Sequence, residues 1–201
     1  MLGLPKVTEL SKQLPKSAIY AKFQMNTADK AKMDSDISRI TIVNEVTSGK
    51  INVADGELIS SFFVLLVVLK KKDFDEKNII TISKLIPQNM LLVLEYQDVA
   101  KLVVYHTKLM QTEWKGKDSL SIELKGLNMD TIWDNIIVQV GSIQIEAGNT
   151  LDEQIEIDEH RAKIQKEIER LKKQSKSEKQ PKKKFELSQK INKLKKELEE
   201  V

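Results

Sequence analysis

Residues 57–106 read ELISSFFVLLVVLKKKDFDEKNIITISKLIPQNMLLVLEYQDVAKLVVYH and contain the densest apolar material in the chain. Their first part, residues 59–69, is predominantly apolar. It falls far short of the roughly 20 apolar residues that a helix needs to cross a bilayer. A short apolar run followed by three lysines is typical of a strand that is buried on both faces. We therefore expect a central strand here, and no membrane span.

The segments after this strand predict the topology of a sheet. A helix that begins after Asp75 and ends before Pro87 would connect the central strand to a second strand at residues 90–96. Strand, helix, strand connections by default form right-handed parallel crossovers. Residues 99–106 then return as the second arm of a hairpin and add an antiparallel neighbour. The sequence thus predicts an α+β fold with a mixed β-sheet and flanking helices.

Periodicity outside this stretch places further elements around the sheet. Apolar residues at helical spacing and alternating residues predict helices at 16–23 and 130–140 and strands at 40–46, 119–125 and 143–145. The first 15 residues are punctuated by Pro5 and Pro15, and we expect them to form an irregular arm.

Composition changes after residue 148, and we divide the chain into a globular α+β domain at 1–148 and a helical arm at 149–201. Thr150 and Glu153 have the spacing of a capping box, which marks a helix start. Pro181 interrupts the arm, and proline disrupts a helix interior, so we expect an antiparallel helical hairpin rather than one long helix. Apolar residues with coiled-coil spacing occur in both halves: Ile157, Ile164, Ile168, Leu171, Leu187, Ile191, Leu194, Leu198 and Val201.

The positive charge of the chain is concentrated at one place. The net charge is +3, but residues 170–184 hold eight basic residues against one acid, Glu178. These eight candidates for contact with nucleic acid are Arg170, Lys172, Lys173, Lys176, Lys179, Lys182, Lys183 and Lys184. In the predicted hairpin they would form the loop at its far end and the turns beside it.

Composition also excludes several classes of chemistry. The chain has no cysteine and only two histidines, so disulfides, thiolate nucleophiles and a multi-histidine metal centre are excluded. Its seven glycines are scattered, and it has neither a phosphate-binding GxxxxGK[ST] motif nor a methyltransferase glycine-rich loop. We therefore expect no cofactor and no resident metal.

The first residues lack the apolar region of a signal peptide, which indicates a cytoplasmic protein.

One catalytic alternative stays open at this point. Asp98 precedes one predicted strand, and Glu123 and Lys125 lie two residues apart on another. A spaced Asp and Glu-x-Lys set is used by metal-dependent nucleases to hold Mg²⁺ and orient water. Glu and Lys are so frequent in this chain that the pattern also arises by chance, and on an amphipathic strand these side chains would simply face solvent.

The basic segment also has more than one interpretation. Eight cations in an exposed loop would contact phosphates without reading bases, and such binding weakens steeply with salt. A lysine-rich loop can instead solubilise a coiled coil, and a helical hairpin can dock a larger partner through its flanks. The sequence does not choose among DNA binding, partner binding and solubility, nor does it indicate an oligomeric state.

Several segments together resemble the bacterial family named domain of unknown function 4391. They are LGLPK at 2–6, IYAKF at 19–23, ISRITIVNEV at 37–46, LIPQNMLLVLEY at 85–96 and EKQPKKKFELSQKINKLKKELEE at 178–200. The resemblance implies a gene neighbourhood with type III restriction-modification and helicase genes of phage defence. The resemblance implies restriction-modification or helicase subunits as partners. Our leading hypothesis is a non-catalytic accessory subunit of such an assembly, whose basic arm binds the DNA backbone or a partner subunit.

Overall fold

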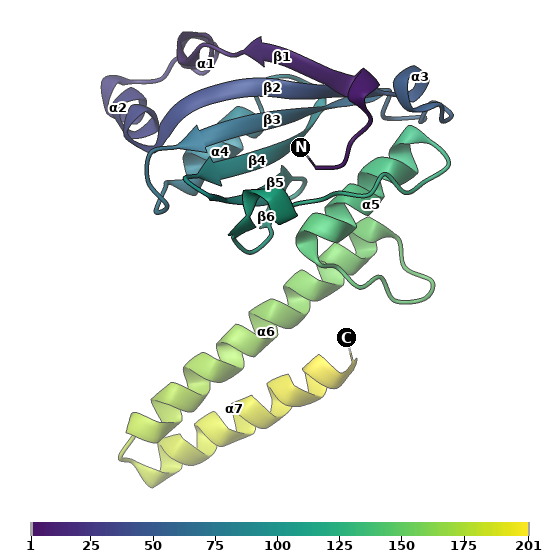
Figure 1. Cartoon of the computed structure of the whole chain (residues 1–201). Coiled ribbons are helices and arrows are strands. Elements are labelled where there is room, and N and C mark those ends of the chain that lie inside the picture. Colours follow the sequence, from purple (N-terminus) through teal and green to yellow (C-terminus); the bar gives the residue numbers. More distant parts are fainter. Residues whose placement is uncertain (1, 201) are drawn as a thin grey trace. The chain divides into compact units, whose positions relative to one another are not determined.

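A computed structural model describes residues 2–200, and the chain forms two compact units at residues 1–143 and 144–201. The first unit contains a sheet and most of the short helices, and the second contains two long helices (Figure 1). No helix in the described part of the chain combines the length and the apolar character needed to span a membrane. The helical elements are η1 Lys6–Thr8, α1 Lys16–Lys22, α2 Thr27–Asp36, α3 Ser48–Ile51, α4 Glu76–Ser83, η2 Lys117–Ser119, α5 Met129–Gly141, α6 Leu151–Ser177 and α7 Pro181–Glu200.

The sheet is mixed, which confirms the predicted α+β class. Its strands lie in the order β1, β2, β3, β4, β5, β6. The short strand β7 also pairs with β5. Strands β3 and β4 are parallel and are connected through α4, as the sequence predicts, whereas all other neighbours are antiparallel. The strands are β1 Glu9–Gln13, β2 Ile37–Thr47, β3 Ser61–Leu69, β4 Asn89–Tyr96, β5 Val99–Tyr105, β6 Leu109–Gln111 and β7 Lys115–Gly116.

The central strand β3 is covered on both faces, which explains why its sequence is continuously apolar. Leu65 and Val67 share one buried cluster with Ile19 of α1 and Ile79 of α4. Phe62 belongs to the opposite face because side chains alternate along a strand. Its ring lies 5.2 Å from that of Trp133 in α5, measured between centroids. The α1 and α4 helices therefore cover one face of the sheet, and α5 covers the other.

The predicted strand at residues 119–125 is absent, and the structure shows why. Only Ser121 forms an isolated bridge, to Leu2, although the flanking Leu120 and Ile122 are buried. The Gln139 side chain of α5 accepts a hydrogen bond from the Glu123 amide at 3.0 Å and donates one to the Glu123 carbonyl at 2.8 Å. A helix side chain thus makes the backbone hydrogen bonds that a neighbouring strand would otherwise make.

Two further predictions about short segments were wrong. Residues 9–13 form the edge strand β1 instead of an irregular arm, and all five of its residues are exposed. A strand without a buried face has no apolar alternation for sequence analysis to detect. Residues 143–145 form no strand, because the chain turns at Ser142, which ends α5 in the left-handed conformation.

Candidate nucleic-acid interface

The arm begins with the predicted capping box. The Thr150 hydroxyl accepts from the Glu153 amide at 3.3 Å, and the Glu153 carboxylate accepts from the Thr150 amide at 2.8 Å. This hydrogen bond from the Thr150 backbone keeps the pKa of Glu153 below its ordinary value. The two residues accept hydrogen bonds from amide groups that a helix start leaves without partners, and they thereby stabilise the start of α6.

The helices α6 and α7 pack along their apolar side chains. Ile164, Ile168 and Leu171 of α6 and Ile191 of α7 form one buried cluster. The partly buried Leu187, Leu194 and Leu198 of α7 pack against it. Farther along, His160 Nε2 lies 3.5 Å from the carboxylate of Glu197, near the end of α7. The start of α7 therefore lies near the end of α6, and the two helices present one shared end to solvent (Figure 1).

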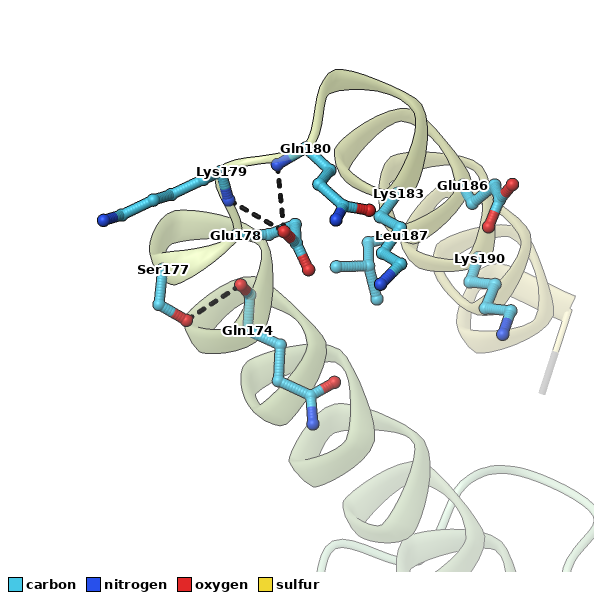
Figure 2. Close-up of a pocket in the computed structure, with 9 residues that line it drawn as sticks. All are labelled: Gln174, Ser177, Glu178, Lys179, Gln180, Lys183, Glu186, Leu187 and Lys190. Carbon is cyan, nitrogen blue, oxygen red and sulfur yellow. Dashed lines mark hydrogen bonds between the residues drawn. The ribbon is translucent and has the colours of Figure 1, made fainter.

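The connection between the helices is short and ordered by its only acid. Glu178 ends α6 in an extended conformation, and its carboxylate accepts from the amides of Lys179 at 2.8 Å and Gln180 at 2.9 Å (Figure 2). The hydrogen bond from the Gln180 amide is the main reason that the pKa of Glu178 lies below its ordinary value. Pro181 then opens α7 at a position where a helix needs no amide donor. The carboxylate is thus hydrogen-bonded to backbone.

Seven of the eight basic residues predicted from sequence form an exposed cationic surface. Among the side chains of residues 2–199, no carboxylate oxygen lies within 4.0 Å of any of these seven lysines. We define this group as the basic tip: Lys172, Lys173, Lys176, Lys179, Lys182, Lys183 and Lys184, all exposed.

The eighth predicted residue, Arg170, differs from the others. Its guanidinium is paired with Glu167 through two nitrogen–oxygen contacts of 2.7 and 2.6 Å. This pair raises the pKa of Arg170 and lowers the pKa of Glu167, in each case mainly through the side-chain hydrogen bond. The charge of Arg170 is therefore compensated locally.

A recess of about 720 Å³ lies beside the connection between the helices (Figure 2). Lys179 and Lys183 of the basic tip line it, together with Lys190 and the amide side chains of Gln174 and Gln180. The carboxylates of Glu178 and Glu186 line it as well. Ammonium and amide groups are donors that suit phosphate oxygens. Sequence analysis missed Lys190, although it lies one heptad after Lys183 and therefore on the same side of α7.

Three lysines lie at the positive end of the α7 dipole, and the negative end of the α6 dipole lies beside them. Lys182, Lys183 and Lys184 occupy the first turn of α7, which contains no acid. The start of a helix carries a partial positive charge, so cations there repel it and anions are favoured. An anion bound near these lysines would relieve this repulsion.

The three residues of the nuclease alternative are not brought together by hydrogen bonds or ion pairs. Glu123 and Lys125 form an ion pair with each other. Asp98 lies in the turn between β4 and β5 with a side chain that is 97% exposed, and its carboxylate is 3.9 Å from Lys117. Across the part of the chain that the structure describes, no group of three His, Cys, Asp or Glu side chains could hold a metal ion. The structure thus pairs Glu123 with Lys125 and places Asp98 beside Lys117.

Comparison with known proteins identifies one family. Residues 2–198 match the family model described as "Domain of unknown function (DUF4391)". No curated protein and no solved structure matches the chain significantly.

Proposed function

The chain belongs to the DUF4391 family, and we propose that its helical arm binds the phosphate backbone of nucleic acid through the basic tip. In this proposal α6 and α7 form an antiparallel coiled-coil hairpin that supports the tip. The protein acts in the cytoplasm as a non-catalytic accessory subunit, and the basic tip supplies affinity without reading sequence.

The observation that supports this proposal is the seven exposed lysines without ion pairs in the described structure, beside an acid that hydrogen-bonds to backbone. A surface that only improved solubility would gain as much from intermixed charges of both signs. Concentrated cations release counterions from DNA when they contact its phosphates, which is the main source of affinity in non-specific binding.

The partner belongs to the same proposal. The family resemblance implies restriction-modification or helicase subunits, proteins that themselves act on DNA. A basic arm that contacts the DNA backbone would help to hold such an assembly on its substrate. Affinity capture of the tagged full chain from its native host, followed by mass spectrometry, would test this. Recovery of neither class of subunit would count against the partner assignment.

The binding test changes three lysines of the tip. We expect the triple variant with Lys182→Glu, Lys183→Glu and Lys184→Glu to bind duplex DNA at least about tenfold more weakly at low salt. The slope of log affinity against log salt should also become shallower, by about 0.9 for each phosphate that the variant no longer neutralises. Fluorescence anisotropy with a labelled duplex over a series of salt concentrations measures both quantities.

A matched control distinguishes the effect of losing the basic tip from the effect of lowering the net charge of the chain. Lys6→Glu, Lys12→Glu and Lys32→Glu change the charge of the chain by the same amount at exposed positions of the first unit. This control should keep most of the affinity and the wild-type salt slope. If the tip variant also keeps both, the basic tip does not bind DNA.

No specific observation favours the nuclease alternative: Glu123 is paired with Lys125, and Asp98 lies 3.9 Å from Lys117. We therefore do not propose it as a second function.

A further inference from the structure

One aromatic side chain lies exposed beside the basic tip. Phe185 of α7 is 64% exposed, whereas every other large hydrophobic residue exposed to a comparable degree within residues 2–200 is aliphatic. The described structure gives its ring no aromatic or cation partner. A phenylalanine that contributes nothing to either core is a candidate for an intermolecular contact.

Helix geometry places Phe185 on the face of α7 that points away from α6. Leu187, which packs against α6, follows Phe185 by two residues and therefore lies about 200° around the helix axis. Lys182 precedes Phe185 by three residues and Gln189 follows it by four, so both share its face. All three side chains are exposed. The outward face of α7 thus combines an aromatic ring with a lysine of the basic tip.

We propose that this outward face binds single-stranded nucleic acid, with Phe185 stacked on an unpaired base and the neighbouring lysines on the phosphates. This inference rests on the proposed function and names its substrate class. The faces of bases are hidden in the stack of a duplex, but unpaired bases expose them. Aromatic stacking combined with a cationic surface is the general means by which proteins bind single strands without sequence preference.

The surroundings of Phe185 favour a base over a lipid bilayer. A helix that lies in a membrane surface needs a continuous apolar face. The neighbours of Phe185 on its face are Pro181 and three polar residues, Lys182, Ser188 and Gln189, all of them exposed. A single ring among hydrogen-bonding groups can contact one base, and its polar neighbours can contact the adjacent phosphates and sugars.

The test compares single-stranded and duplex probes with the full-length chain. The probes are a labelled oligothymidine of about 20 nucleotides, longer than a typical single-strand binding site, and a duplex of equal length. We expect Phe185→Ala to weaken oligothymidine binding about tenfold and to leave duplex binding and the salt slope unchanged. Phe185→Leu should weaken it similarly, because leucine keeps the apolar surface but cannot stack.

A tryptophan substitution provides a direct reading of stacking. Phe185→Trp should retain oligothymidine binding, and its fluorescence should be quenched by the probe beyond any change in the wild type, which carries Trp114 and Trp133. Far-ultraviolet circular dichroism checks that each variant is folded, which we expect because the side chain is exposed.

The outcomes distinguish this inference from the proposal on which it rests. If Phe185→Ala or Phe185→Leu binds oligothymidine like the wild type, the stacking inference is overturned. The phosphate-binding proposal is then tested by the triple lysine variant alone. Vesicles that contain phosphatidylserine serve as a third probe. Loss of vesicle binding in Phe185→Ala with intact oligothymidine binding would assign the ring to a membrane and overturn the inference.

Discussion

Asp36 is a buried and hydrogen-bonded carboxylate of the first unit. Its side chain is only 3% exposed. It accepts from the Asp75 amide at 2.9 Å and the Asn78 side chain at 2.8 Å, and it lies 2.7 Å from Lys71 Nζ. Burial by itself would raise the pKa of Asp36, but these donors, with Lys71 first among them, lower it below its ordinary value. The carboxylate ties the end of α2 to the start of α4.

We expect Asp36→Asn to lower the free energy of unfolding by about 2–3 kcal/mol at neutral pH. The amide that replaces one carboxylate oxygen would face other donors, and buried donors without acceptors cost about 1–3 kcal/mol each. Urea denaturation measures the change. Asp118→Asn is the control, because Asp118 is exposed, and it should change stability by less than about 0.5 kcal/mol.

The pH dependence of Asp36 has a definite sign. Because its pKa is lower in the folded protein than in the unfolded chain, its stabilisation is fully present above the unfolded value of about 3.9. The stabilisation is lost as the pH falls through the folded value. Stability of the wild type should therefore decrease below about pH 4, and Asp36→Asn should decrease less over the same range. Parallel curves for the two proteins would contradict this assignment.

At the scale of elements, the contact between α6 and α7 depends on a small apolar cluster. Ile168 is 2% exposed and lies within it. We expect Ile168→Ala to lower the melting temperature of the helical arm, with a loss of about 2–4 kcal/mol, because the substitution removes buried methyl groups and leaves a cavity. Circular dichroism at 222 nm follows the melting. Lys163→Ala, at an exposed position of the same helix, should melt close to the wild type.

At the scale of the whole molecule, each of the two units has a buried apolar cluster of its own. Trp114 and Trp133 both belong to residues 1–143, so their fluorescence reports the first unit. We expect Ile168→Ala to shift the transition seen at 222 nm while the tryptophan transition stays unchanged, and Asp36→Asn to shift the tryptophan transition. Equal shifts in both signals for either variant would show that the chain unfolds as one cooperative unit.

The sequence by itself determined the class of the fold and most of its long elements. The continuous apolar run of β3, the crossover through α4, the hairpin of β4 and β5 and the capping box at Thr150 were all predictable. Each of these features is encoded by residues that are close in the chain, through periodicity, capping spacing or strand length. The position of the basic segment could also be predicted, because the charge of a segment follows from its composition.

Only the tertiary structure decided which groups have partners. In residues 119–125, the backbone of Glu123 hydrogen-bonds to the Gln139 side chain and not to a neighbouring strand. The tertiary structure also placed the ammonium of Lys101 4.9 Å from the ring centroids of both Phe74 and Trp114, where burial lowers its pKa. Within the arm, it left Phe185 exposed. Exposure and pairing depend on which segments come to lie side by side, and periodicity within one segment carries no information about that.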